Sequence, residues 1–213
     1  MNNMPNTALD YARRGTPIFP CGKDKRPLTA RGFHDASTDP GRVKLWWLKN
    51  SSALVGVPTG KVSGFFVLDV DNASHGVDGE QSLRDLERQY GKLPETRTAR
   101  TPSGGRHLYF KCIEGVGNST GKLGPGLDIR ADGGYVIAPG SPGYEWVSET
   151  EPATAPEWLI SLLTKPKNGT PVKAAQSPTV AFSNGDGTAT DLQLSRAWWP
   201  RCRQRQRGSG TTR

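Results

Sequence analysis

The sequence has few cysteines and no long apolar run. Its three cysteines, Cys21, Cys112 and Cys202, are far apart and show no C-x-x-C spacing. Such a set forms neither a disulfide framework nor a structural zinc site, so buried free thiols are the simpler interpretation. No stretch approaches the roughly 18 apolar residues of a membrane span, and the first residues lack a charged segment followed by an apolar signal core. We therefore expect a cytoplasmic protein that does not enter a membrane.

A complete ATPase-type phosphate loop is also missing. Residues 115–122 resemble one, but Val116 stands where the first glycine is required, and Leu123 follows the lysine in place of serine or threonine. The sequence therefore excludes an ATPase motor of this type.

Most of the chain carries little net positive charge. Of the net charge of +8, residues 1–165 contribute +2, from 20 Lys and Arg against 18 Asp and Glu, and residues 166–213 contribute +6, from 8 against 2. The last segment is rich in Pro, Gly, Ser and Thr, so we expect a disordered basic tail after a single catalytic domain at 1–165. Nucleic-acid binding by that domain must then rest on local patches rather than on net charge.

One apolar run ends in two acids. Residues 65–68 are four consecutive β-favouring apolar residues, and Asp69 and Asp71 follow at a spacing of two. Alternation along a strand puts both carboxylates on one face, where they repel unless a cation lies between them. The pair is therefore a candidate Mg²⁺ or Mn²⁺ site, although a solvated exit from a strand has the same pattern.

A glycine turn follows further along the chain. Residues 97–110 predict a strand, a tight Gly-Gly turn and a second strand that opens at Arg106 or His107. Ser103, Arg106 and His107 would then surround a turn whose backbone N–H groups can approach phosphate oxygens. An ordinary hairpin with a surface histidine is the alternative interpretation.

A third motif covers residues 126–139. It predicts a strand, a Gly-Gly turn and an apolar strand. Asp128 and Arg130 share one face of the first strand, while Leu127 and Ile129 share the opposite face and are expected in the core. An acid and an arginine presented together suit a metal-phosphate site.

The remaining patterns are structural. Helices are expected at 7–14, 39–47, 80–90 and 158–163, and Trp46 and Trp47 are expected to anchor the core. Residues 53–58 predict a strand that forms a hairpin with the strand at 64–70. The basic loop at 22–27 is either a plain surface turn or a nucleic-acid contact.

The order of the three motifs resembles the N-terminal primase-polymerase domain of the archaeo-eukaryotic primase superfamily, of the type found in bifunctional replication proteins of plasmids and phages. The resemblance covers roughly residues 7–163 and includes the segments 56–60 and 128–136. It implies an α/β (α+β) fold, with a mixed β-sheet, flanking helices, a catalytic centre related to the RNA-recognition motif, and an N-terminal α/β extension.

The resemblance also implies a DNA primase/polymerase, a nucleotidyltransferase. Asp69, Asp71 and Asp128 match the acids that hold two divalent ions, Mg²⁺ or Mn²⁺, and with His107 they make up the implied catalytic set. His107, with Ser103 and Arg106, matches the motif that binds the triphosphate of the incoming nucleotide.

By the same resemblance, Arg130 is expected to contact that nucleotide. The implied partners are single-stranded DNA as template and primer, an NTP or dNTP, and a replicative helicase. A metal-dependent nuclease or phosphodiesterase and a non-catalytic nucleotide- or DNA-binding module are the competing hypotheses.

Overall fold

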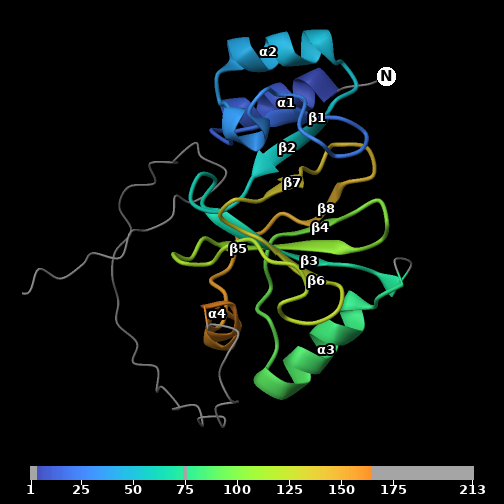
Figure 1. Ribbon diagram of the computed structural model, residues 1–213, viewed down its shortest axis with the longest axis vertical. Coiled ribbons are helices and arrows are strands. Elements are labelled where there is room, and N and C mark those ends of the chain that lie inside the picture. Colours follow the sequence, from blue (N-terminus) through green and yellow to red (C-terminus); the bar gives the residue numbers. More distant parts are fainter. Residues whose placement is uncertain (1–3, 74–75, 165–213) are drawn as a thin grey trace, which may run out of the picture.

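The structure is a computed structural model that describes residues 4–73 and 76–164 (Figure 1). The expected tail at 166–213 lies outside the described residues. Within 4–73 and 76–164, every helix is too short or too polar to cross a bilayer.

The described part folds into four α-helices, a 3-10 helix and eight strands. The helices are α1 (Met4–Arg13), α2 (Pro40–Lys49), α3 (Gly79–Tyr90) and α4 (Glu157–Thr164), with the 3-10 helix at Gly32–Asp35. The strands are β1 (Phe19–Cys21), β2 (Leu54–Pro58), β3 (Phe65–Val70), β4 (Thr98–Arg100), β5 (Arg106–Lys111), β6 (Leu127–Arg130), β7 (Tyr135–Ile137) and β8 (Glu145–Ser148).

Local signals set the helix ends. Asp39 caps α2 by accepting a hydrogen bond from the backbone N–H of Gly41 at 2.9 Å, and Pro40 occupies the first turn. Asp78 caps α3 in the same way, and Gly91 follows its last residue with φ of 104°. These helices confirm the predictions made from the sequence.

The strands form two antiparallel sheets. One has the order β1-β2-β7 and the other the order β6-β3-β5-β4-β8. The α+β class is confirmed. Every strand pair within the sheets of the described residues is antiparallel, so the expected mixed sheet is corrected to two antiparallel ones.

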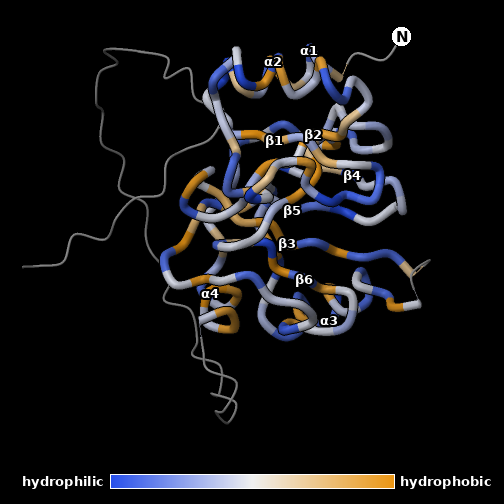
Figure 2. The backbone as a smooth tube through the Cα atoms, turned by 45° about the horizontal axis from the view of Figure 1, so that its top comes forward, coloured by the Kyte–Doolittle hydropathy of each residue, from blue (hydrophilic) through white to orange (hydrophobic). Residues whose placement is uncertain are grey.

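The two sheets and the helices are stacked in layers. In Figure 1, α1 and α2 lie above the three-stranded sheet, and α3 and α4 lie below the five-stranded sheet. One hydrophobic cluster joins α1 and α2 to the upper face of the five-stranded sheet through residues such as Trp47, Val67 and Tyr109. A second, with Leu68 and Leu159, fills the space between its lower face and the helices α3 and α4. Figure 2 shows hydrophobic residues running along strands of both sheets.

The predicted hairpin between 53–58 and 64–70 is wrong, because β2 and β3 belong to different sheets. Both strands are buried on both faces and show no alternation, so the sequence carried no signal to choose a partner. The chain passes from one sheet to the other at residues 59–64 and returns at 131–134. The two passages lie side by side, since the backbone N–H of Thr59 donates to the carbonyl oxygen of Gly134 at 3.0 Å and that of Lys61 to Asp132 Oδ1 at 2.7 Å.

Gly60 makes this close approach possible. Its φ is +85°, and a Cβ built there would lie 2.7 Å from the backbone nitrogen of Asp132. We expect Gly60→Ala to lower the free energy of unfolding by about 2–4 kcal/mol, from left-handed strain plus overpacking. Gly115 is a matched control, since its φ is +84° and nothing lies within 4 Å of its built Cβ. Chemical denaturation measures both, and equal losses in the two variants would contradict the close approach.

Candidate active site

Three predicted residues form a row across the neighbouring strands β6, β3 and β5 of the five-stranded sheet. Asp69 of β3 lies directly opposite His107 of β5 on one side and Asp128 of β6 on the other. Residues opposite each other in antiparallel strands point to the same face with Cβ atoms about 4.5–5.5 Å apart. His107 Nε2 lies 3.5 Å from Asp69 Oδ1. The sheet register therefore brings together residues from all three sequence motifs.

Arg130 lies over the two carboxylates of the row. Its guanidinium is 2.8 Å from Asp128 Oδ2 and 3.8 Å from Asp69 Oδ2. Asp128 Oδ1 also accepts a hydrogen bond from the backbone N–H of Gly121 at 3.0 Å. Burial raises the pKa of Asp69; the charge of Arg130 opposes this shift, and that of Asp128 adds to it. The two acids thus repel each other, and a cation between them offsets the repulsion.

His107 is buried and neutral. Burial, followed by the positive charges of Lys25 and Arg130, lowers the pKa of His107 to about 3. Its Nδ1 atom has no hydrogen-bond partner among the described residues. Buried polar atoms are normally paired, so this nitrogen marks a place where a ligand or a water is expected. A neutral imidazole offers one donor and one acceptor there without adding a charge.

Asp69 and His107 of the row, but not Asp128, line a cavity of about 270 Å³ between the two sheets. Asp69, His107 and Arg130 line it from the five-stranded sheet, and residues 133–137, which include β7, line it from the three-stranded sheet. Its remaining lining residues come from separate loops: Lys25, Asn118 and Tyr144. The cavity has polar walls and two cationic side chains, which suits an anionic ligand.

The predicted metal ligands are only partly assembled. In the parts of the chain that the structure describes, no group of three or more His, Cys, Asp or Glu side chains is arranged to hold a metal ion. Asp69 and Asp128 are nevertheless adjacent, and carboxylate oxygens are the ligands that Mg²⁺ and Mn²⁺ prefer. Mg²⁺ is commonly held by one or two carboxylates together with phosphates of the substrate. This pair therefore fits such an ion.

Asp71 and Ser103 lie beyond the row, where the glycine turn packs on the end of β3. A Cβ built on Gly105 would lie 2.6 Å from the carbonyl oxygen of Val70, so this position requires glycine. Asp71 follows β3, and its charge acts on His107. Ser103 Oγ is 3.0 Å from Thr101 Oγ1, and Ser103 does not line the cavity.

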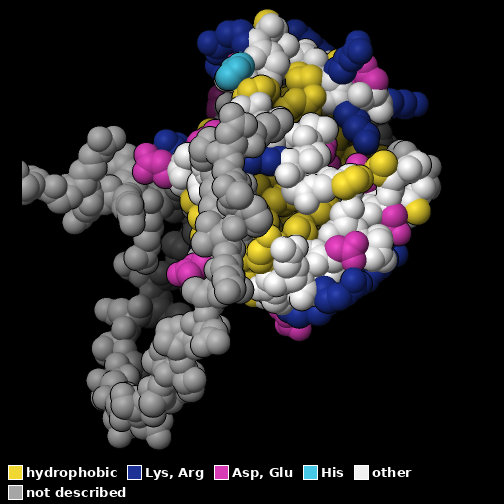
Figure 3. Space-filling view, turned by 60° about the horizontal axis from the view of Figure 1, so that its bottom comes forward, with side chains coloured by type: hydrophobic (Ala, Val, Ile, Leu, Met, Phe, Trp, Pro, Cys, Tyr) yellow, Lys and Arg dark blue, Asp and Glu magenta, His cyan; other side chains and the backbone are white. Residues whose placement is uncertain are grey.

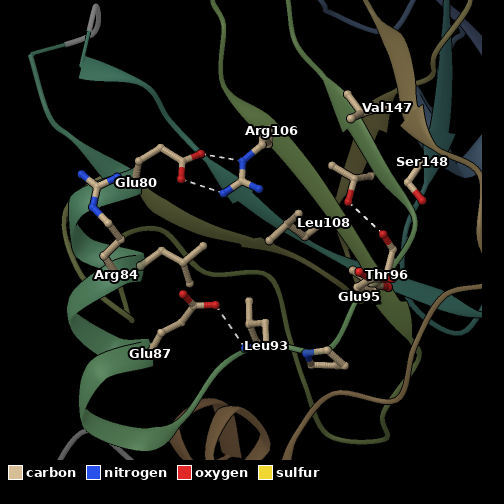
Figure 4. A pocket seen from close by; sticks show the side chains of 13 residues that line it. Glu80, Arg84, Glu87, Leu93, Glu95, Thr96, Arg106, Leu108, Val147 and Ser148 are labelled. Atoms are coloured by element: carbon tan, nitrogen blue, oxygen red, sulfur yellow. Dashed lines mark hydrogen bonds and ion pairs between the residues drawn. The ribbon is translucent and has the colours of Figure 1, made fainter.

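Arg106 is not brought to the row. It is the first residue of β5, so its side chain points to the face opposite that of His107. There it forms a bidentate ion pair with Glu80 of α3, with both N–O distances at 2.6 Å (Figure 4). This pair lines a separate groove of about 540 Å³ between α3 and the strands. The prediction that Arg106 belongs to the nucleotide site has no support in this geometry.

Figure 3 shows part of the surface on the side of the molecule that carries α3 and α4. In the part visible in Figure 3, Lys and Arg side chains lie among Asp, Glu and hydrophobic ones. That visible part therefore shows no broad basic patch that would add to the two cations of the cavity.

The sequence was also compared with known proteins. The family model described as "bifunctional DNA primase/polymerase, N-terminal", Prim-Pol, matches residues 8–158. The chain belongs to the Prim-Pol family. The match contains all eight strands and therefore the whole row of His107, Asp69 and Asp128. No curated protein matches the sequence significantly.

Membership of the Prim-Pol family makes this chain a primase/polymerase domain of the nucleotidyltransferase type, which binds DNA and nucleotides. Three cavity residues of this Prim-Pol domain were missed by sequence reasoning. Lys25 lay in a loop with two open interpretations, Asn118 lay in the imperfect phosphate loop, and Tyr144 belonged to none of the three motifs. No spacing pattern links these positions to the acids, because separate loops bring them to the cavity.

Proposed function

We propose that this domain catalyses template-directed nucleotidyl transfer on single-stranded DNA and depends on Mg²⁺ or Mn²⁺. The observation that carries the proposal is the row of His107, Asp69 and Asp128 beside Arg130, next to a cavity that Lys25 and Arg130 line. Acids adjacent to an arginine and a neutral imidazole suit a substrate that brings both phosphates and a divalent cation.

In the reaction, the 3′ oxygen of the primer forms a bond to the α-phosphorus of the incoming nucleotide. The bond from that phosphorus to the oxygen bridging to the β-phosphorus breaks, and pyrophosphate leaves with the electron pair. The 3′ hydroxyl proton passes to solvent or to a nearby base. When bound, divalent ions supply Lewis-acid chemistry, favouring the 3′ alkoxide and neutralising charge on the leaving pyrophosphate.

Asp69 and Asp128 are the proposed ligands on this sheet, and Asp71 is the proposed third carboxylate. Their role is to hold cations against the substrate phosphates. Burial of Asp69 among low-dielectric surroundings strengthens its interaction with any cation that reaches it. The three acids therefore supply charge and position, and they do not themselves form bonds to phosphorus.

Arg130 and His107 are the proposed contacts to the triphosphate, with Ser103 at the turn beyond them. Arg130 offers a planar set of N–H donors, of which one already binds Asp128. His107 presents an imidazole whose Nδ1 is unpartnered among the described residues. Donors fixed in place before the reaction stabilise the negative charge that develops on the phosphates.

The proposed partners are single-stranded template with its primer, an NTP or dNTP, and a replicative helicase. The plasmid or phage type of replication system is part of the same proposal, since it follows from the resemblance of the motifs alone.

Primer extension tests the proposal directly. We expect the purified full chain to lengthen a 5′-labelled primer on a single-stranded template when an NTP or dNTP and Mg²⁺ or Mn²⁺ are present, and to stop when EDTA is added. Omitting the primer tests de novo synthesis in the same assay. Shortening of the labelled strand would instead show a nuclease, and nucleotide binding without any product would show a non-catalytic module.

A further inference from the structure

Lys25 is a cation that lines the cavity from the side of the three-stranded sheet. It lies in the loop after β1, yet it lines the cavity together with Asp69, His107 and Arg130. The cavity thus has a cation on each side, Arg130 from the five-stranded sheet and Lys25 from the loop of the other sheet.

The loop has the hydrogen bonds of a tight three-residue hairpin turn. The backbone N–H of Lys25 donates to the carbonyl oxygen of Gly22 at 2.9 Å, and that of Gly22 donates to the carbonyl oxygen of Arg26 at 2.8 Å. In such turns the last loop residue adopts a left-handed conformation, and glycine is preferred there. Lys25 occupies this position with φ of 66°.

No other non-glycine residue in the described parts of the chain has a positive φ. A left-handed lysine is strained relative to glycine, and the turn itself gains nothing from the side chain. Strain of this kind is concentrated at functional sites. The strain at Lys25 therefore points to a role for its amine.

Contacts with two tyrosines hold Lys25 in place. The hydroxyl of Tyr135 in β7 donates a hydrogen bond to the carbonyl oxygen of Lys25 at 3.2 Å. Burial raises the pKa of Tyr144, while the charge of Lys25 and a side-chain hydrogen bond to it act in the opposite direction. The amine is therefore directed toward Tyr144 and the cavity. Lys23 and Arg26 of the same loop do not line the cavity.

We propose that Lys25 binds the triphosphate of the incoming nucleotide from the side opposite Arg130. This inference rests on the proposed function and adds a residue to it. The two cations flank a neutral imidazole, so together they can neutralise part of the charge of a bound triphosphate. The loop at 22–27 then acts as a nucleotide contact rather than as a plain surface turn or a DNA contact.

Lys25→Gly is the informative variant, because glycine removes the amine and relieves the left-handed strain. We expect its thermal midpoint to be equal to or above that of the unchanged protein. In primer extension by the full chain, we expect the KM for the nucleotide to rise about tenfold, as for loss of one charged hydrogen bond, with a smaller change in kcat. Lys25→Arg keeps the charge and should restore most of the affinity.

Lys23→Ala is the matched control, since it removes the same charge from the same loop outside the cavity. A second measurement uses inorganic triphosphate and calorimetry in the absence of DNA, where only Lys25→Gly should weaken binding, again about tenfold. The dissociation constant for single-stranded DNA should be the same in both variants.

The inference is overturned if Lys25→Gly leaves both the nucleotide KM and triphosphate binding unchanged, or if Lys23→Ala weakens them equally. It is also overturned if Lys25→Gly weakens DNA binding alone. These outcomes leave the proposed function standing whenever the unchanged protein extends primers. Conversely, the unchanged protein could make no product while Lys25→Gly still weakens triphosphate binding. That result would contradict the proposed function and support the role of Lys25.

Discussion

Asp69→Asn and Asp128→Asn are each expected to reduce nucleotide incorporation by about 10³-fold, the scale of losing a principal charge-stabilising group in an active site. The two carboxylates lie directly opposite each other on β3 and β6, so either substitution removes one of the two adjacent ligands proposed for the cations. Asparagine has nearly the same shape and removes only the negative charge. Single-turnover primer extension at saturating DNA, with Mg²⁺ and with Mn²⁺, measures the effect.

The same substitution separates chemistry from folding. The pKa of Asp69 is raised in the folded state, so its ionised form is less favourable there than in the unfolded chain. Its contribution to stability is lost as the pH rises through the folded-state pKa. We therefore expect Asp69→Asn to be at least as stable as the unchanged protein at pH 7 without divalent ions. Circular dichroism melting gives this comparison.

Glu145→Gln is the matched control for the acids. Glu145 lies on the edge strand β8 of the same sheet, is exposed, and pairs with Arg100 at 2.9 Å. We expect incorporation close to that of the unchanged protein. Near-normal extension by either Asp69→Asn or Asp128→Asn would show that the row is not the catalytic centre.

The second large effect is expected from Arg130 and not from Arg106. Arg130 lies over the two carboxylates and lines the cavity, while Arg106 pairs with Glu80 on the opposite face of the sheet. Arg130→Met should reduce the efficiency of nucleotide use by about 10²-fold, since it removes donors aimed at the phosphates. Arg130→Lys, which retains the charge but lacks the planar donor set, should lose less.

Arg106→Met should instead act on stability. It breaks a partly exposed ion pair and should lower the free energy of unfolding by about 0.5–1 kcal/mol, with nucleotide use little changed. Nucleotide KM and kcat, with denaturant unfolding of both variants, provide the test. If Arg106→Met lost nucleotide use as strongly as Arg130→Met, the assignment of the two faces would be wrong.

The local structure of the site could be predicted from the sequence because it depends on short-range rules. Alternation along a strand put Asp128 and Arg130 on one face and Leu127 and Ile129 on the other, and the structure confirms this, with both apolar side chains fully buried. The helix α2 began where Asp39 and Pro40 predict it. Such features need only neighbouring residues, so they can be read from the chain alone.

Sheet partners depend on contacts that no local pattern encodes. The strands β2 and β3 are apolar on both faces, so their sequences favour burial without specifying which strand lies beside them. Sequence proximity favoured a hairpin, whereas in the structure the two strands belong to different sheets. The position of Arg106 was open for a similar reason: whether β5 begins at Arg106 or at His107 decides which face the guanidinium occupies.

By itself, the sequence determined the residue types of the site and their order, because acids after an apolar strand and glycines at tight turns follow from local chemistry. Tertiary structure decided which of them meet. In the sheet register, His107 and Asp128 lie opposite Asp69, whereas Arg106 points to the other face. Lys25 lines the cavity from a loop that is distant in the sequence. The physical reason is that sheet pairing and packing between two layers are set by burial of whole faces, to which residues far apart in the chain contribute together.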